Sequence, residues 1–482
     1  MKKLFVLLGV LCALCFVACS NFQLAGGDVG VVSLAIGDDL ASEIRSAASL
    51  RSATGGSYSL TASIRGEYSD SQTVTVANGN YSGVTFTFEG IPVGKKIILD
   101  LTAKANSNYI WYGNSGKHTV EQGENLLTIS LGRVSGVLMW DSSSVKIAPY
   151  GNYDFDNGTG TTVVGVQEYP PSWCFDAQGN FYVIGSNGGS KYSLQNDGTY
   201  DSNYSTFSGG DLSHVSYDNA NSALYGMSDS EISRIVENQP SSSIITFSSG
   251  ITTPVEFAVH NNIAYVADQS EGDDDPTPII KVVGFNLQDK SKQGEGAPFK
   301  LPAIFGNQPT YQMIYHEGAL YLLLRRVEIN DASNASDDNP AEHFSLGALV
   351  KINPNTLSLD TSFGNGGYLG LSSLKSEFRD LKTVHDGSAG PVDFNGGGNG
   401  SSIFYGPAGF VAVMPKKLVI ADAGFLMELN EANVYLTKKT RVITIDLESL
   451  AFDSTDVDNG YYQDEIYGSF NNEGYSYIVI TN

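Results

Sequence analysis

The sequence predicts an all-β protein, in which a small β-sandwich precedes a larger array of repeated strand units. Three observations favour this fold class: glycine is abundant at 53 of 482 residues, aromatic residues make up 11% of the chain, and only 17% of residues are charged. Aromatic residues favour strands, and glycine favours the turns between them. The chain is 41% hydrophobic and longer than one core usually supports, so we expect at least two domains.

The first 20 residues have the pattern of a secretory leader. Lys2 and Lys3 form a basic start, and an uncharged run extends from Leu4 to Ala18. This run is shorter than the roughly 20 apolar residues that a bilayer-spanning helix needs. We therefore predict a signal peptide over residues 1–18, followed by a tether over residues 19–28.

The leader ends in Phe16-Val17-Ala18-Cys19, which resembles a bacterial lipobox, although Phe stands where that motif more often has Leu. The resemblance implies that Cys19 receives a diacylglyceryl group and becomes the new N-terminus. Acyl chains would then anchor the protein to a membrane. Ser20 lacks the acidic side chain that retains some lipoproteins at the inner membrane, so we expect the outer membrane, on its periplasmic or surface side. The alternative is an ordinary signal peptide that contains cysteines.

The number of cysteines and the net charge limit which disulfides, reactive thiols and partners we expect. Cleavage before Cys19 would leave only Cys19 and Cys174, and a lipidated Cys19 cannot form a disulfide. Cys174 lies in an apolar stretch, so we expect a buried and inert thiol. The formal net charge of −24 argues against nucleic acid as a partner, because phosphates would be repelled.

Residues 29–132 read as one small all-β module. Ser57–Arg65 alternates apolar and polar positions, and Ile97–Ala103 follows a turn that contains Gly90, Pro92 and Gly94. We expect a closing strand over Leu126–Leu131 and one short helix over Leu40–Leu50. The hairpin Phe88-Glu-Gly-Ile-Pro-Val-Gly-Lys95 resembles hairpins of immunoglobulin-like or prealbumin-like modules in secreted bacterial proteins.

Residues 133–482 repeat a unit of two strands joined by a polar turn. Tyr182, Tyr225 and Tyr265 are 43 and 40 residues apart, and Tyr321 follows after 56. These periods are typical of β-propeller blades, and we predict six to eight of them. The longer gap from Tyr321 to Val419 holds either a divergent blade or insertions. The alternative fold is a large irregular β-sandwich or a β-solenoid.

Two segments carry a resemblance to secreted bacterial propellers. Phe175–Val183 fits the blade pattern F-D-x-x-G-N-x-Y-V, and Asp360–Gly367 fits the pattern D-x-S-F-G-x-x-G of one such repeat class. The resemblance implies a propeller fold but assigns no activity.

The sequence contains no catalytic motif, so we assign no catalytic residue, no metal ligand and no cofactor. Its six histidines lack zinc-ligand spacing, and it has no G-x-S-x-G elbow or phosphate-binding loop. His260 and His316 occupy similar turn positions in successive units, for which a structural role is the simpler explanation. The acidic segments 268–275 and 330–338 offer oxygen ligands that suit calcium, but solvated loops explain them more simply.

The sequence therefore predicts a lipid-anchored extracytoplasmic protein whose propeller-like domain binds or scaffolds a protein or glycan partner. One alternative is a hydrolase or lyase with its site in the central channel of the propeller. The other is an adhesin at the cell surface.

Overall fold

The computed structural model describes most of the region from Val29 to Glu465, and every element of regular structure in that part is a β-strand. The prediction of an all-β protein is thereby confirmed. The predicted helix at Leu40–Leu50 lies outside the described residues. None of the described segments is a helix that is long and apolar enough to cross a bilayer. The described residues are 29–36, 57–77, 83–105, 108–134, 137–140, 145–148, 161–163, 172–185, 188–195, 198–208, 211–237, 239–247, 250–272, 275–302, 305, 309–329, 343–370, 404, 407–430, 433–450, 452–458 and 463–465.

The N-terminal unit consists of two sheets that enclose one core. Apolar side chains alternate along their strands, so one face of each sheet is buried, as for Leu34 and Phe86 in one sheet and Leu60 and Leu99 in the other. One sheet has the order β4 (Thr85–Pro92), β1 (Val29–Ala35), β7 (Gly123–Leu126), and the other the order β3 (Asp70–Ala77), β2 (Ser57–Gly66), β5 (Lys96–Ala105), β6 (Asn108–Thr119), β8 (Ser130–Arg133).

The predicted closing strand over Leu126–Leu131 is wrong in one respect. The chain forms two short strands there, β7 and β8, which belong to opposite sheets. Leu126 is 66% exposed, whereas Leu127 is buried and its amide donates to the carbonyl of Ser33. The alternation of the strand is broken at this point because the chain crosses from one sheet to the other.

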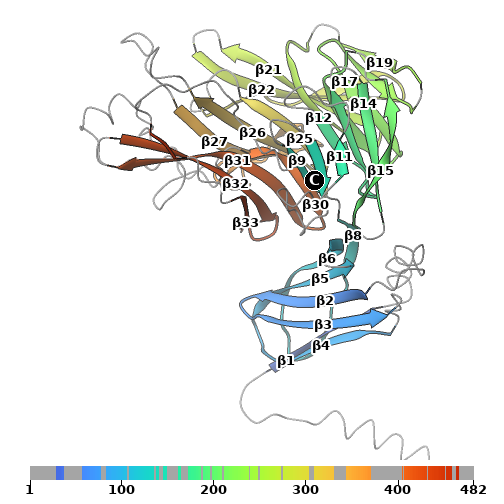
Figure 1. Cartoon of the computed structure of the whole chain (residues 1–482), viewed down its shortest axis with the longest axis vertical. Helices are drawn as coiled ribbons and strands as arrows, with labels where there is room; N and C mark the ends of the chain where they lie inside the picture. The colour runs from blue at the N-terminus through green and yellow to red at the C-terminus, as the bar shows by residue number, and fades with distance from the viewer. Residues whose placement is uncertain are drawn as a thin grey trace, which may run out of the picture.

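The rest of the chain forms six successive antiparallel sheets within the described residues, here numbered I to VI (Figure 1). Sheet I has three strands, and the other five are each built on four consecutive strands. The strands of sheets I to III are β9 (Val137–Trp140), β10 (Val145–Ala148), β11 (Thr161–Val163); β12 (Ser172–Phe175), β13 (Phe181–Gly185), β14 (Gly188–Leu194), β15 (Tyr200–Phe207); and β16 (His214–Asp218), β17 (Ala223–Met227), β18 (Glu231–Ile235), β19 (Ser242–Thr246).

Sheets IV to VI have longer second and third strands and one additional short strand each. Their strands are β20 (Pro254–His260), β21 (Ile263–Gly272), β22 (Asp275–Asn286), β23 (Ser291–Glu295), β24 (Phe299–Lys300); β25 (Thr310–His316), β26 (Ala319–Ile329), β27 (His343–Asn353), β28 (Ser358–Leu359), β29 (Tyr368–Leu369); and β30 (Pro407–Met414), β31 (Lys417–Asn430), β32 (Asn433–Asp446), β33 (Phe452–Asp458), β34 (Gln463–Glu465).

The six sheets follow one another around a circle. The first strands β12, β16, β20 and β25 pack beside one another in that order, and β30 contacts β25, β26 and β9. The circle closes where β11 of sheet I contacts β15 of sheet II. This radial order of four-stranded sheets is the arrangement of a β-propeller. Because β30 contacts β25 directly, the long spacing from Tyr321 to Val419 reflects insertions and not a divergent sheet between V and VI.

The repeated tyrosines lie in the cores between successive sheets. Tyr182 belongs to the core between sheets II and III, Tyr225 to that between III and IV, Tyr265 to that between IV and V, and Tyr321 to that between V and VI. Each is at most 8% exposed. The sequence period is therefore the period of the interfaces between sheets.

Turns of neighbouring sheets are joined by side chains. The carboxylate of Asp218, at the turn of sheet III, accepts the backbone N–H groups of Asn261 and Asn262 in sheet IV at 2.9 and 2.7 Å. Asn219 accepts the N–H of Ala177 in sheet II at 2.6 Å. These bonds fix the position of one sheet relative to the next at the end of the propeller that carries the turns after the first strands.

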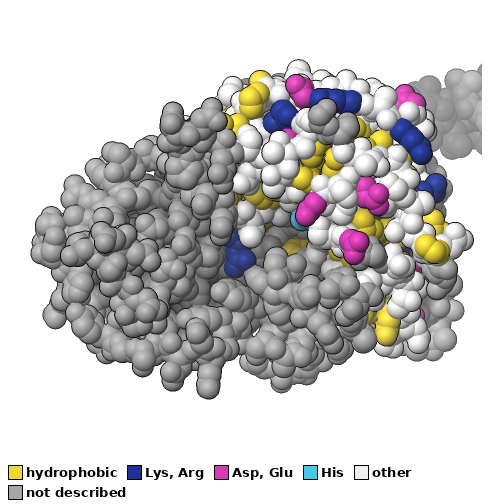
Figure 2. Space-filling model, turned by 90° about the horizontal axis from the view of Figure 1, so that it is seen from above, with side chains coloured by type: hydrophobic (Ala, Val, Ile, Leu, Met, Phe, Trp, Pro, Cys, Tyr) yellow, Lys and Arg dark blue, Asp and Glu magenta, His cyan; other side chains and the backbone are white. Residues whose placement is uncertain are grey.

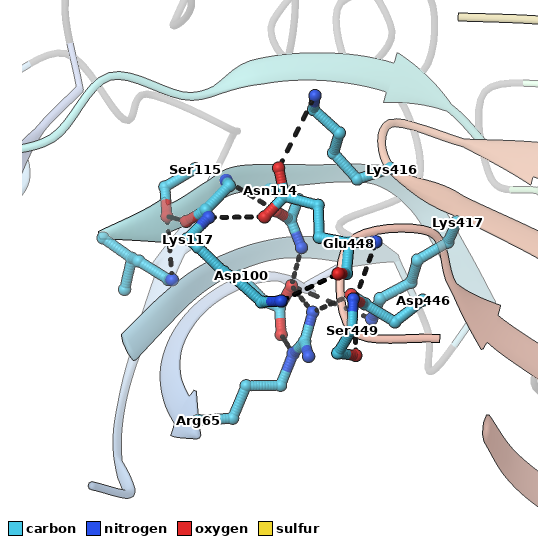
Figure 3. Close-up of polar contacts among 12 residues, drawn as sticks. Arg65, Asp100, Asn114, Ser115, Lys117, Lys416, Lys417, Asp446, Glu448 and Ser449 are labelled. Atoms are coloured by element: carbon cyan, nitrogen blue, oxygen red, sulfur yellow. Dashed lines mark hydrogen bonds and ion pairs between the residues drawn. The ribbon is translucent and has the colours of Figure 1, made fainter. Parts of the chain in front are cut away.

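The N-terminal unit is attached to this same end (Figures 1 and 3). Arg65 of β2 forms ion pairs with Asp100 of β5 and with Asp446 of sheet VI, the latter at 2.7 Å between Nη2 and Oδ2. Asp446 ends β32, at the turn before β33. The opposite end of the propeller, where the first strands begin, faces away from the N-terminal unit.

Candidate functional site: the axial ring of the propeller

Four polar residues occupy the same position in sheets II to V. In each of these sheets the core tyrosine, on the second strand, pairs with a residue of the first strand. The residue two positions earlier on that first strand is polar in all four sheets. All four lie towards the end of the first strand that faces away from the N-terminal unit. We refer to these residues as the axial ring: Ser172, His214, Glu256 and Gln312.

Two members of the axial ring bind the backbone of the next sheet. The Ser172 hydroxyl accepts the N–H of Val215 at 3.0 Å, and the Gln312 side-chain oxygen accepts the N–H of Phe410 at 2.5 Å. Ser216, two residues after His214, accepts the N–H of Val259 in the same way at 2.9 Å. A first strand pairs with a neighbouring strand of its own sheet on one side only, so some of its backbone N–H groups have no partner in the sheet. These side chains of the preceding sheet accept hydrogen bonds from such N–H groups.

The other two members form a pair between sheets III and IV. Nδ1 of His214 lies 3.4 Å from Oε2 of Glu256, whose other oxygen accepts the N–H of Phe257 at 2.9 Å. Burial alone would lower the pKa of His214, but the charge and hydrogen bond of Glu256, with Asp229 further away, raise it above its usual value. Glu256 is 6% exposed at its side chain and His214 is 26% exposed. The imidazole is thus held by a buried carboxylate, which favours its protonated form, while part of the ring meets solvent and can transfer a proton to a ligand.

Trp173 joins sheets II and VI next to the axial ring. Its Nε1 donates to the carbonyl oxygen of Phe410 at 3.3 Å, and a methyl group added at Gly409 would overlap its indole ring. The same added group would lie 2.7 Å from the side-chain oxygen of Gln312. Sheets II and VI are separated by sheet I, so Trp173 joins two sheets that are not adjacent in the ring. Trp173 is 6% exposed and directly follows Ser172 of the axial ring in the sequence.

The end of the propeller that faces away from the N-terminal unit is seen in Figure 2, where acidic side chains lie beside a histidine. Asp268, in the acidic segment 268–275, is buried and accepts the N–H groups of Thr252 and Thr253 at 2.7 and 2.8 Å. Lys281 lies 3.6 Å from its second oxygen. The first carboxylate of segment 268–275, that of Asp268, therefore has a structural role.

The other residues singled out from the sequence have varied positions. Cys19 and the segment 330–338 lie outside the described residues. His260 and His316 end β20 and β25, at equivalent positions near the attached end of the propeller. The ring of His260 stacks on the ring of Tyr315, with 3.8 Å between the ring centres, so His260 has a packing role. Cys174 is half-buried and not fully buried as predicted. Burial, with the charges of Asp176 and Glu256, raises the pKa of its thiol well above the usual value, in keeping with an inert cysteine.

No group of three or more His, Cys, Asp or Glu side chains is placed to hold a metal ion within the described part of the chain. Calcium binding by the acidic segments stays a prediction, because most of their side chains lie outside that part.

No sequence motif marks the axial ring. Its members differ in type, and the spacing from each member to its tyrosine is 10, 11, 9 and 9 residues in sheets II to V. Aligning the repeats on Tyr182, Tyr225, Tyr265 and Tyr321, with the turns left free to vary, would have shown a polar position that recurs upstream. The signal was therefore present in the repeat, but not in any local motif.

Together the fold and the axial ring define an all-β, propeller-like protein with a polar axial site beside a buried tryptophan. Residues 307–468 match the family described as TdpA C-terminal domain. This segment contains sheets V and VI, from β25 to β34. Among curated proteins, none matches the chain.

Solved structures similar to this chain include a quinonprotein alcohol dehydrogenase-like protein from Bacteroides thetaiotaomicron, with 12% identity, a TM-score of 0.33, and coverage of 89% of this chain and 94% of that chain. The Dos1 propeller has 10% identity, a TM-score of 0.30, and coverage of 59% and 60%. A chain of the nidogen/laminin complex has 12% identity, a TM-score of 0.32, and coverage of 66% and 92%. Similarity at this level assigns no activity.

Proposed function

We propose that this chain is a lipid-anchored extracytoplasmic protein that binds or scaffolds a protein or glycan through its propeller. In this proposal residues 1–18 are a signal peptide, Cys19 carries the lipid, and residues 19–28 are the tether. Residues 29–132 are a β-sandwich that acts as a spacer, and residues 133–482 form a propeller whose six sheets are six blades.

One observation carries this proposal: β1, where the chain enters the N-terminal unit, lies at the end of that unit farthest from the propeller (Figure 1). The axial ring begins at the opposite end of the propeller. An anchor that precedes β1 would therefore hold the ring away from the membrane, where it meets a partner in solution. A fully extended tether over residues 19–28 adds roughly 35 Å of reach.

The anchor is tested by feeding cells a clickable fatty-acid analogue. We expect label on the wild-type chain and none on Cys19→Ala, while Cys15→Ala keeps its label as the matched control. Label retained on Cys19→Ala would contradict the anchor. Protease treatment of intact cells then distinguishes a surface adhesin, which is cleaved, from a periplasmic protein, which is protected.

Binding is tested with the purified chain lacking residues 1–18 on a panel of glycans and outer-membrane proteins. We expect a bound member whose affinity falls in His214→Ala and Glu256→Ala but not in Lys292→Ala, which removes an exposed ion pair elsewhere. Equal affinity in all four proteins would place the binding surface away from the axial ring.

The second candidate is an enzyme, favoured by the His214–Glu256 pair. A histidine held by a buried carboxylate is suited to general acid–base catalysis. Turnover of a glycoside, ester or uronide substrate that is lost in His214→Asn, with a pH–rate profile that shifts in Glu256→Gln, would favour the enzyme. Binding without turnover would favour the first proposal.

A further inference from the structure

Within the described residues, the sheet at which the ring closes, sheet I, has shorter strands than the sheets that flank it. Sheet I has strands of only four, four and three residues, and it joins its neighbours through β30 on one side and β11 against β15 on the other. We define the seam as sheet I with these two junctions. Along the rest of the ring, four extensive apolar cores lie between successive sheets.

We propose that the N-terminal unit is a clamp that holds this seam closed. The chain passes from β8 of the N-terminal unit to β9 of the seam after only a few residues. The N-terminal unit then contacts the sheets on both sides of the seam. It is thus placed to oppose their separation, a role distinct from that of a spacer.

One contact of the clamp is with sheet VI (Figure 3). Besides the pair of Arg65 with Asp446, the ammonium group of Lys117 donates to the carbonyl oxygen of Glu448 at 2.7 Å, and its backbone N–H donates to the Glu448 carboxylate. In the other direction, Lys417 of β31 lies 3.7 Å from Asp100 and 4.4 Å from the centre of the Tyr112 ring. Several of these charges are partly buried, and Asp100 and Asp446 are among the buried residues, so solvent screens the contact less than it would an exposed pair.

The other contact of the clamp is with sheet II. Nη2 of Arg133, at the end of β8, donates to the carbonyl oxygen of Gln195 at 2.6 Å. Gly198, in the same turn between β14 and β15, packs directly against Asn108 and Tyr109 of β6. A Cβ at Gly198 would lie 3.0 Å from the Asn108 side chain, and the φ angle of +80° there also favours glycine.

The two contacts hold sheets that are separated by sheet I. Opening the seam would move sheet VI away from sheet II, so it would break one of the two contacts. The N-terminal unit therefore adds its contact free energy to ring closure, as a cross-link adds to the closure of a loop.

Hydrogen exchange on the intact chain tests this proposal. Releasing the sheet VI contact in Arg65→Ala should speed amide exchange about tenfold or more in β9, β10, β11 and β30, because a lost charge-assisted hydrogen bond lowers the free energy of local opening by that order. Exchange in β16 to β23 should stay unchanged. Arg133→Ala, which releases the sheet II contact, should produce the same pattern.

The double variant distinguishes a clamp from two independent contacts. Loss of either contact opens a clamp, so Arg65→Ala with Arg133→Ala should exchange little faster in β9–β11 than the more affected single variant. Additive effects, or faster exchange confined to β5, β6 and residues 446–450, would overturn the proposal. Lys292→Ala is the control for loss of a surface cation, and it should leave the seam unchanged. Should Arg65→Ala fail to fold, Arg65→Lys retains the charge but loses the forked geometry, and it should show a smaller increase at the same strands.

Discussion

Asp218 shows how one carboxylate can serve two sheets. It is fully buried, and its oxygens accept from Ala220 and Asn221 in its own turn as well as from Asn261 and Asn262 in the next sheet. Asp218 is the last residue of β16, directly before a polar turn that is visible in the sequence. The sequence does not reveal the bonds to sheet IV, because these depend on the angle between successive sheets, which no local pattern encodes.

Asp218→Ala should lower the free energy of unfolding by roughly 2–4 kcal/mol, because it leaves buried backbone donors without an acceptor. The decrease is measured as a lower midpoint of urea unfolding. Asp289→Ala is the matched control, since among the described residues Asp289 accepts from Ser291 alone, in an exposed turn. Equal midpoints for the two variants would contradict the role given to Asp218.

His214 offers a second test at the level of single residues. Its pKa should lie above the usual 6.5, and Glu256→Gln should lower it, because the carboxylate that favours the imidazolium is removed. Since the raised pKa belongs to the folded state, the pair stabilises the fold below about pH 6.5, and this contribution is lost as pH rises through the raised pKa. NMR titration of the histidine ring signals, assigned with His214→Asn, measures the shift. An unchanged pKa in Glu256→Gln would contradict the pairing.

At the scale of elements, the first strands and second strands of sheets II to V were largely predictable. Their β-branched and aromatic residues and their polar turns mark them clearly in the sequence, as at Phe181–Ile184 and Leu320–Leu324. The lateral contacts of the first strands were not predictable, because Trp173 and Gly409 are distant in sequence. Only the closed ring brings them together.

Gly409→Ala should destabilise the protein by about 1–3 kcal/mol, since the added methyl group overlaps the indole of Trp173. Displacement of that ring should also change the tryptophan emission spectrum, to which only two other tryptophans contribute.

Gly294→Ala is the control for this change, because the nearest atom to its added group, in Leu357, is 3.8 Å away. An emission spectrum and unfolding midpoint equal to those of Gly294→Ala would show that Trp173 does not occupy the position above Gly409.

At the scale of the whole molecule, the order of the two units was predictable, but their attachment was not. The change from a short unit to a repeating one is visible in the sequence near Val134. The pairing of Arg65 with Asp446 joins residues far apart in the chain, and neither belongs to a motif. Long-range ion pairs of this kind depend on the relative placement of two folded units.

The attachment should loosen in acid. Burial would raise the pKa of Asp446, but hydrogen bonds from Ser449 and the charge and hydrogen bond of Arg65 outweigh it and hold the pKa below its usual value. A lowered pKa stabilises the folded arrangement above about pH 4, and this contribution is lost as pH falls through the lowered value.

Spin labels at Leu126→Cys and Val236→Cys, both exposed positions, report on the attachment when Cys19 is replaced by serine and residues 1–18 are absent. We expect one narrow distance distribution at pH 7 that broadens below about pH 4. Asp446→Asn should be broad already at pH 7. Asp360→Asn is the control, because the pKa of Asp360 is also lowered but its partners, Ser362 and Lys351, lie within sheet V. A narrow distribution in Asp446→Asn would contradict this account.

The sheets of the propeller differ in the length of their strands, so the face that bears the axial ring is not the same on all sides. The second and third strands have 14 residues each in sheet VI, 11 each in sheet V, and 10 and 12 in sheet IV, but only five each in sheet III. The extra length extends beyond the axial ring, on the side away from the N-terminal unit. Among the described residues, the strands of sheets IV to VI therefore form a wall beside the ring, whereas the second strand of sheet III ends level with His214, so a ligand at the ring would contact sheets IV to VI more than sheet III.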